Sequence, residues 1–443
     1  MFEALTQFLP RLQAADFSGG GGSPVAGELR QAIGFFVGRH WELGLSDAIG
    51  ILRRAGLWNA PSPLDARLDA LDGRTVAALV AYAERKDRLC EGSFLDCLAS
   101  GQMAQWLARL RAIDEAGEDA VAKAPDAKTA RMEAMAQAIL LGLACGDALG
   151  VPVEFMQRGS FKVDDMQGWG THSQPPGTWS DDTSLALAFA MSLVPGGFNA
   201  LSAGRNFQAW YYDRAFTPHG EVFDVGGATA KAIRRMQTVV SPELAGGRDE
   251  RDNGNGSLMR IAPLVLSLLD VPDPAIRFET VRKASSITHA HPLACTCCFV
   301  FIEFLRLLAQ GLGREEAYGK LCADFAKGLP CLEDAVLARL SRVLNGGLAS
   351  LPESAIQSGG FVLHTLEASL WCLLTTAGFA EAVLKAVNLG DDTDTTGTVT
   401  GAMAGLAYGV EAIPAQWIAD LAKVKEIKFI ALGAARDCLG EPR

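Results

Sequence analysis

Apolar residues recur at helical intervals along most of this 443-residue chain. Residues 367–387 show the spacing well, at Leu370, Trp371, Leu374, Phe379, Val383 and Leu384. Within each of the two groups, 370–374 and 379–384, the apolar positions follow the spacing of a helix with 3.6 residues per turn. Segments that alternate apolar and polar residues, as half-buried strands do, are few. The pattern therefore predicts an all-α protein.

A polar stretch interrupts this pattern near residues 116–129. It follows the acidic run Asp114–Asp119 and contains Pro125 among alanines and lysines, a composition typical of linkers. We expect a small, mainly helical accessory domain over residues 1–115, a linker over 116–129 and a larger domain over 130–443. Within the accessory domain, the spacing predicts helices over 27–39, 44–57, 73–90 and 93–112.

Composition limits the classes of partner. Hydrophobic residues make up 49% and charged residues 21% of the chain, which is ordinary for a globular protein. The net charge of −11 argues against nucleic acid as a partner. No uninterrupted apolar run reaches the roughly 18 residues that span a membrane, and no basic-then-apolar signal segment opens the sequence. We therefore expect no membrane segment.

Ten cysteines are scattered along the chain without paired Cys-x-x-Cys motifs. Cys295, Cys297 and Cys298 stand near His289 and His291, which leaves two interpretations: a zinc site, or buried thiols on an apolar helix. Buried thiols are favoured, because three thiols so close together on one helix cannot all face one ion. Unpaired cysteines are typical of the reducing cytosol, so we expect a cytoplasmic protein.

Two acidic clusters, far apart in the chain, carry the strongest chemical signal. The first is residues 180–183 (SDDT), where a loop enters an apolar helix, and the second is residues 391–395 (DDTDT), before a helix of small residues. One residue suffices to cap a helix, so both clusters hold more polar oxygens than capping requires. Hard divalent cations prefer such oxygen ligands. If the fold joins the two clusters, they make a site for one or two metals.

Two further segments offer groups for binding. In residues 142–155 (GLACGDALGVPVEF), a helix of small residues ends at a glycine and a proline, and Glu154 follows on a loop. A solvated glutamate and a functional one fit this pattern equally well, whereas Asp147 is expected to make a structural hydrogen bond. Residues 253–263 (NGNGSLMRIAP) expose backbone N–H groups before a helix, which suits a phosphate or diphosphate. Nearby, His289 fits either the same cavity or a structural role.

Taken together and in this order, these segments resemble the ADP-ribosylglycohydrolase family over about residues 130–430. The similarity is to its bacterial members related to dinitrogenase-reductase-activating glycohydrolase. The motifs that carry it are GDALGVPVEF, GTWSDDTSLAL, GNGSLMRIAPL, THAHP and VNLGDDTDTTGTVTGAMAGLAYG. The resemblance implies a compact, all-α catalytic domain with a two-metal centre. It also implies hydrolysis of the bond between the ribose of ADP-ribose and an acceptor, often an arginine guanidinium.

The resemblance also assigns roles to individual residues. The ligands of two divalent cations, Mg²⁺ or Mn²⁺, would be Ser180, Asp181, Asp182, Asp392, Asp394 and Thr395. Proton transfer would fall to Glu154, Asp181 or Asp182. The substrate would contact Asn255, Gly256, Ser257, Met259, His289 and Phe361. Two positions depart from the family pattern: Ser180 replaces a threonine but keeps the hydroxyl, and His364 replaces a residue that is commonly acidic.

The partner implied by the resemblance is an ADP-ribosylated protein or an ADP-ribosyl small molecule. Arginine is the favoured acceptor, while serine, thymidine and free ADP-ribose derivatives stay open. An alternative is an immunity-type protein that binds and blocks an ADP-ribosylating toxin, as well as or instead of hydrolysing ADP-ribose. In that alternative the accessory domain over residues 1–115 would contact the toxin.

Overall fold

The structure is a computed structural model that describes residues 1–15, 24–40, 43, 45, 48, 51–52, 71–86, 93–116, 127–238 and 241–440. Contacts divide the chain into two compact units, with the division between Asp126 and Ala127. This division falls within the predicted linker, whose residues 117–126 lie outside the described residues, as does most of the helix predicted over 44–57. Each unit has an apolar core of its own.

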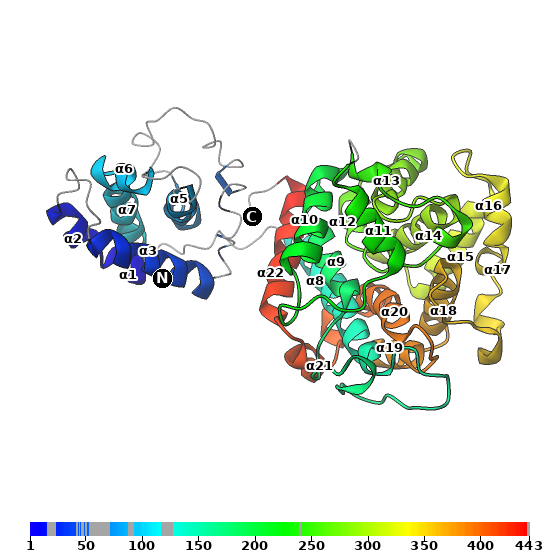
Figure 1. Cartoon of the computed structure of the whole chain (residues 1–443). Coiled ribbons are helices and arrows are strands. Elements are labelled where there is room, and N and C mark those ends of the chain that lie inside the picture. The colour runs from blue at the N-terminus through cyan, green and yellow to red at the C-terminus, as the bar shows by residue number, and fades with distance from the viewer. Residues whose placement is uncertain are drawn as a thin grey trace. The chain divides into compact units, whose positions relative to one another are not determined.

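The first unit is helical, as predicted (Figure 1). Its helices are α1 (Glu3–Thr6), α2 (Leu9–Ala14), α3 (Pro24–Arg39), α5 (Gly73–Lys86), α6 (Ser93–Ala99) and α7 (Gln102–Ala116). The single helix predicted over 93–112 is wrong, because α6 and α7 are separate. Gly101 lies between them with a φ of 76°, in the left-handed region that ends helices.

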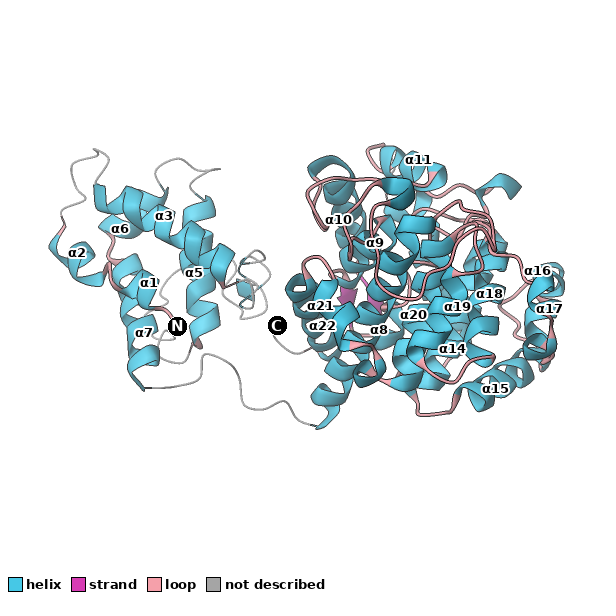
Figure 2. Cartoon of the chain, turned by 90° about the horizontal axis from the view of Figure 1, so that it is seen from below, coloured by secondary structure: helices cyan, strands magenta, loops and turns pink. Residues whose placement is uncertain are grey.

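The second unit is helical too, and the all-α prediction is confirmed. Its longer helices are α8 (Ala127–Gly150), α10 (Ala200–Asp213), α13 (Pro274–Ser286), α14 (Pro292–Ala309), α15 (Arg314–Ala326), α18 (Val362–Leu374), α20 (Thr393–Tyr408) and α22 (Val424–Leu439). The shorter ones are α9 (Asp181–Ala190), α11 (Gly227–Arg235), α12 (Leu264–Leu268), α16 (Asp334–Arg339), α17 (Ser341–Leu344), α19 (Phe379–Val387) and α21 (Ala415–Asp420). The strands β1 (Leu193–Val194) and β2 (Gly197–Phe198) form one short antiparallel pair, coloured magenta in Figure 2.

Helices α8 and α20 pack backbone against backbone in the core of the second unit. A Cβ added at Gly146 would lie 2.0 Å from the carbonyl oxygen of Gly397. One added at Gly150 would lie 2.4 Å from the Cα of Asp394. Only glycine allows this approach, which fixes the N-terminal end of α20 against the C-terminal end of α8.

The expectation that no segment is long and apolar enough to span a membrane is wrong for two helical segments. Residues 127–153 and 292–309 are long and apolar enough to cross a membrane by length and composition. However, 83% and 89% of their most apolar windows are buried inside the protein. Their apolar side chains face neighbouring helices, as expected of core helices. Neither segment is an uninterrupted apolar run, because a few charged and polar residues are scattered within each one.

Helix α14 carries the three neighbouring cysteines, and the buried-thiol interpretation is confirmed. Cys295, Cys297 and Cys298 are free and buried. Among the described residues, the groups close enough to hold a metal contain none of the three. His291 instead caps α14, since its Nδ1 accepts the N–H of Leu293 at 3.1 Å.

Candidate active site

Asp147 anchors the first acidic cluster to the C-terminal end of α8. Its carboxylate accepts the Ser180 N–H at 2.9 Å, and the N–H and hydroxyl of Thr183 at 3.0 and 2.7 Å. The structural hydrogen bond expected of Asp147 is therefore confirmed. Ser180 is the N-cap of α9, and its Oγ accepts the N–H of Asp182 at 3.2 Å. Capping is thus complete without the carboxylates of Asp181 and Asp182.

The second acidic cluster lies against the first. The Thr395 hydroxyl donates to Asp182 Oδ1 at 3.5 Å, a contact between residues 213 positions apart. The Thr395 N–H donates to Asp394 Oδ1 at 2.8 Å. Asp392 Oδ2 accepts an amide N–H of Asn255 at 2.8 Å. The fold therefore joins the two clusters, which is the condition that the sequence left open.

Two members of the second cluster stand apart from this meeting point. Asp391 is exposed and has a positive φ of 60°. Thr393 is buried, and its hydroxyl donates to the carbonyl oxygen of Gly150 at 2.8 Å. Thr393 therefore joins α20 to the end of α8, and Asp391 faces solvent.

Glu154 reaches the same site from the end of α8. It is the C-cap of the 3₁₀ helix η5 (Val151–Val153), which continues directly from α8. Its side chain is buried, with 3% exposed. One carboxylate oxygen each of Glu154, Asp392 and Asp394 lies within 4.8 Å of the others. A solvated loop glutamate is therefore excluded.

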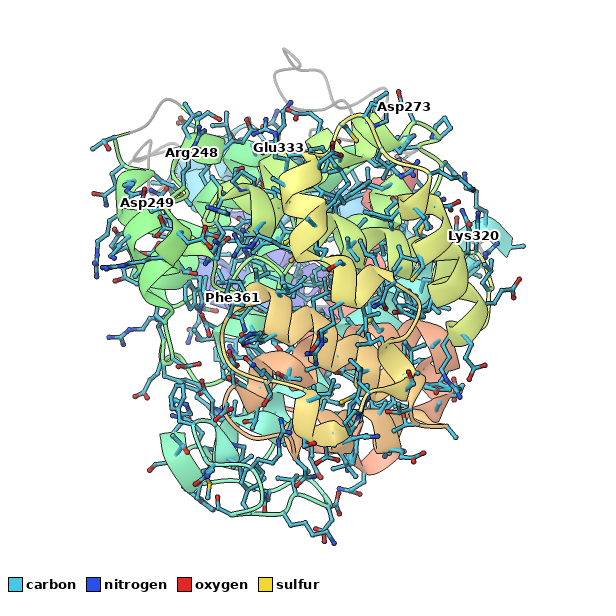
Figure 3. All side chains as sticks on the ribbon, turned by 90° about the vertical axis from the view of Figure 1, so that its right-hand side faces the viewer. Arg248, Asp249, Asp273, Lys320, Glu333 and Phe361 are labelled. Atoms are coloured by element: carbon cyan, nitrogen blue, oxygen red, sulfur yellow. The ribbon has the colours of Figure 1, made fainter. Side chains whose placement is uncertain are left out.

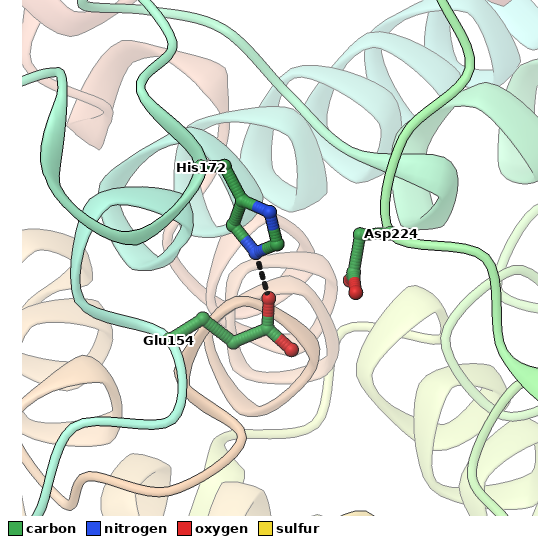
Figure 4. A group of neighbouring side chains, drawn as sticks. All are labelled: Glu154, His172 and Asp224. Carbon is green, nitrogen blue, oxygen red and sulfur yellow. Dashed lines mark hydrogen bonds and ion pairs between the residues drawn. The ribbon is translucent and has the colours of Figure 1, made fainter.

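Two further residues of this site, His172 and Asp224, are not among the predicted ones. His172, at the end of the 3₁₀ helix η6 (Gly170–His172), has its Nε2 2.5 Å from Glu154 Oε2 (Figure 4). Asp224 comes from the loop before α11, and its carboxylate faces the same Glu154 side chain, with ligand atoms of all three residues within 4.8 Å. Neither residue belongs to a cluster or a motif, so their spacing in the sequence carried no signal.

Unbalanced negative charge dominates the site. Asp182 Oδ2, Asp392 Oδ1 and Asp394 Oδ2 are buried and accept no hydrogen bond. Burial, reinforced by the neighbouring carboxylates, raises the pKa of Asp181, Asp182 and Asp394 well above the usual range of aspartate. Burial also raises the pKa of Glu154 to about 8, against the opposing hydrogen bond from His172. Burying unpaired carboxylates is unfavourable, and hard divalent cations fit these oxygen donors.

A glycine turn lies beside the second cluster and carries residues predicted to bind substrate. The side-chain amide of Asn255 donates to Asp392 Oδ2 and also to Thr365 Oγ1, at 2.9 Å. Gly254 pairs with Phe361 in an isolated β-bridge, which places Phe361, labelled in Figure 3, at the start of α18 beside the turn. Asn255 therefore orients a carboxylate of the second cluster, and its contact with substrate stays a prediction.

His289 lies directly beneath the glycine turn. A Cβ added at Gly256 would lie 2.8 Å from His289 Cε1, so the turn and the ring pack closely. The ring is 2% exposed, and its Nδ1 lies 2.9 Å from Thr288 Oγ1. Burial, with the nearby charge of Arg260, lowers the pKa of His289 to about 3. The His289 ring is therefore neutral and packs against the glycine turn.

Ser257 and Met259 face the core more than the site. The Ser257 hydroxyl accepts the hydroxyl of Ser285 at 2.9 Å and lies 3.4 Å from Cys298 Sγ. Ser257 is fully buried and Met259 is 4% exposed. The substrate contacts predicted for Ser257 and Met259 stay predictions.

Comparisons with known proteins give relatives for the second unit. The sequence profile of the family described as ADP-ribosylglycohydrolase matches residues 128–441. ADP-ribosylarginine hydrolase Tri1 of Pseudomonas putida (strain GB-1) is 33% identical over 301 residues, 67% of this chain and 76% of that protein. The ADP-ribosyl dinitrogen-reductase glycohydrolase of Rhodospirillum rubrum is 31% identical over 290 residues, 63% of this chain and 88% of that protein. A solved structure described as an ADP-ribosylglycohydrolase-related protein complex matches with a TM-score of 0.59 at 36% identity, over 70% of this chain and 99% of that one.

Proposed function

The chain belongs to the ADP-ribosylglycohydrolase family and is a hydrolase of glycosidic bonds, and from this premise we propose that it removes ADP-ribose from arginine side chains with two divalent cations. The proposed metal dependence rests on one observation: the two acidic clusters meet, and three of their buried carboxylate oxygens accept no hydrogen bond. The arginine part rests on the relatives, since those from Pseudomonas putida and Serratia proteamaculans are named ADP-ribosylarginine hydrolases.

The donor set fits the proposed cations. The ligands would be Ser180, Asp181, Asp182, Asp392, Asp394 and Thr395. Every donor is oxygen, which suits Mg²⁺ or Mn²⁺ rather than softer metals. When bound, such cations orient the ribose hydroxyls and activate a water. Asp147 and Asn255 hold the two clusters in place, through the Ser180 N–H and Asp392 Oδ2 respectively.

Glycosidic bonds of ribose break through an oxocarbenium-like state, which gains positive charge as the acceptor leaves. We assign proton transfer to Glu154 rather than to Asp181 or Asp182. Glu154 Oε2 contacts His172 Nε2, and the partly exposed His172 offers a path for the proton toward solvent.

The rest of the substrate is proposed to lie along the glycine turn. Backbone N–H groups near Gly256 suit the diphosphate, since exposed N–H groups bind anions without adding charge. The half-buried ring of Phe361 stands at the edge of the turn, where a nucleotide base can stack on it. Neutral His289 packs against the turn and contributes no charge to the binding of the diphosphate.

ADP-ribose release from arginine-, serine- and nucleic-acid-linked substrates, with and without EDTA, tests the proposal. We expect release from the arginine-linked substrate and its loss in EDTA. Asp394→Asn should lose Mn²⁺ binding and activity while it stays folded. Asp391→Asn is the matched control: the change is the same, the residue is exposed, and asparagine tolerates its positive φ. EDTA-resistant release, or wild-type turnover by Asp394→Asn, would refute the metal assignment.

No feature of the described residues favours the toxin-blocking alternative. It stays a prediction, as does the cytoplasmic location. Deleting residues 1–120 tests it, because loss of toxin binding with intact hydrolysis of a small ADP-ribosyl arginine would assign recognition to the first unit. Unchanged toxin binding by the truncated protein would contradict that assignment.

A further inference from the structure

Arg158 follows Glu154 by four residues and belongs to neither acidic cluster. Its guanidinium donates from all three nitrogens to backbone carbonyl oxygens. Nε donates to the carbonyl of Leu389 at 2.6 Å, Nη1 donates to that of Glu353 at 2.9 Å, and Nη2 donates to that of Ile356 at 2.8 Å. These oxygens lie on two different loops, one before α18 and one after α19. The Arg158 side chain thus joins its own segment to residues 353–356 and to Leu389.

One of these loops leads directly to a predicted metal ligand. The hydroxyl of buried Ser358 donates to the Leu389 carbonyl at 3.1 Å and contacts Arg158 Nη2 at 3.4 Å. The carbonyl of Ser358 in turn accepts the N–H of Asp392 at 3.0 Å. Arg158 is therefore connected to the backbone of Asp392 through a single intervening residue.

The segment that carries Glu154 is tied to the second cluster as well. The Phe155 N–H donates to the Asp391 carbonyl at 2.7 Å, and the Asp391 N–H donates to the Met156 carbonyl at 2.9 Å. Phe155 and Asp391 have φ values of 63° and 60°, which are unfavourable for residues with a side chain. Such conformations persist only where the surroundings hold them.

The contact between these two segments is closest at Arg158 itself. Gly390 has a φ of 77°, and a Cβ added to it would lie 2.5 Å from the backbone nitrogen of Arg158. The two segments therefore contact each other through their backbones. The Arg158 guanidinium adds a hydrogen bond between them, to the Leu389 carbonyl.

We propose that Arg158 is a positioning residue that sets the distance between Glu154 and the second acidic cluster, and through it the affinity for divalent cations. This inference rests on the proposed metal-dependent function. A guanidinium is planar, always charged and rich in donors, so it holds three carbonyls in a fixed arrangement. Its charge also lies just past the C-terminal end of α19, where a cation is favourable. A lysine ammonium keeps the positive charge but lacks the planar set of donors that contacts the three carbonyls.

The experiment compares Arg158→Ala and Arg158→Lys with the wild type in the full chain. Arg131→Ala is the control, because Arg131 Nη2 also donates to a backbone carbonyl, that of Ala309 at 2.7 Å, in the same unit. Mn²⁺ binding is measured by titration calorimetry on metal-free protein. Turnover of ADP-ribosyl arginine is measured at saturating Mn²⁺, and folding is checked by circular dichroism.

We expect both Arg158 variants to bind Mn²⁺ at least about tenfold more weakly, as is typical when a residue that orients metal ligands is replaced. We also expect kcat to fall by a larger factor than KM changes. Arg131→Ala should keep wild-type affinity. If Arg158→Lys is folded and binds Mn²⁺ as tightly as the wild type, the inference is wrong even should Arg158→Ala fail to fold. If the wild type itself binds no Mn²⁺, the proposed function fails, and this inference fails with it.

Discussion

Replacing Gly146 with alanine tests whether the close packing of α8 on α20 holds the site together. The added Cβ would lie 2.0 Å from the carbonyl oxygen of Gly397 and 2.4 Å from its carbonyl carbon. Ordinary contact begins at 3.4 Å, so the two backbones must separate by about 1.4 Å. Helix α20 carries Asp394 and helix α8 leads into Glu154, so this separation also moves the two carboxylates apart.

The expected loss of stability follows from the kind of obstacle. Overpacking a core costs about 1–3 kcal/mol when side chains can shift. Here both obstacles are backbone atoms, so we expect Gly146→Ala to lose at least about 3 kcal/mol. In a domain of this size, about 2 °C of melting temperature corresponds to 1 kcal/mol, which predicts a fall of about 6 °C. Calorimetry with and without Mn²⁺ identifies the transition of the second unit by its response to the metal.

Gly319 provides a control of opposite sign. It is exposed within α15, and a Cβ added there would meet nothing within 4 Å. Gly319→Ala should therefore stabilise the protein by up to about 1 kcal/mol, since alanine favours a helix over glycine. A melting temperature of Gly146→Ala within 1 °C of the wild type, or equal shifts in both variants, would show that this packing is not what positions α20.

The remaining predictions concern charge. Asp147→Ala leaves the buried N–H groups of the first cluster without their acceptor and should cost about 1–3 kcal/mol, read as a lower urea midpoint; an unchanged midpoint would contradict it. Arg277→Met removes the bidentate partner of buried Glu303, which keeps only its 3.2 Å contact with Arg306, and should cost about 3 kcal/mol, whereas Arg277→Met with Glu303→Leu should recover part of that loss; equal losses in both would argue against charge as the cause. In EDTA, stability should fall as pH rises from about 4.3, where glutamate ionises in the unfolded chain, to about 8, the raised pKa of Glu154 in the folded protein. Thermal melts should therefore show a greater gain from Mn²⁺ at pH 8 than at pH 5, and the reverse order would refute this linkage.

Helix content was predictable because it depends on local periodicity, whereas helix ends were not. The regular spacing over residues 367–387 hides a break between α18 and α19. There the hydroxyls of Thr375 and Thr376 donate back to the carbonyls of Trp371 and Cys372, at 2.6 and 2.7 Å. The apolar positions keep helical spacing on each side of the break, and that spacing does not mark where one helix ends and the next begins. The break itself is a backbone feature, since Gly378 is extended, with a φ of −156°, as the N-cap of α19.

The acidic part of the candidate site was predictable for a different reason. Several carboxylates close together in a sequence are unfavourable without a cation, so the two acidic clusters stood out before any fold was known. His172 and Asp224 stand alone in their loops, and nothing in the neighbouring sequence marks either of them. They became visible only when folding placed both beside Glu154.

By itself, the sequence determined the helical architecture, the family and the two acidic clusters, because periodicity, motifs and charge density are local features of the chain. Only the tertiary structure decided that the two clusters meet, that Glu154 is buried between them and His172, and that Arg158 ties their loops together. Each of these facts depends on contacts between residues far apart in the chain. Such contacts arise from the glycine-mediated approach of α8 to α20, which no local pattern specifies.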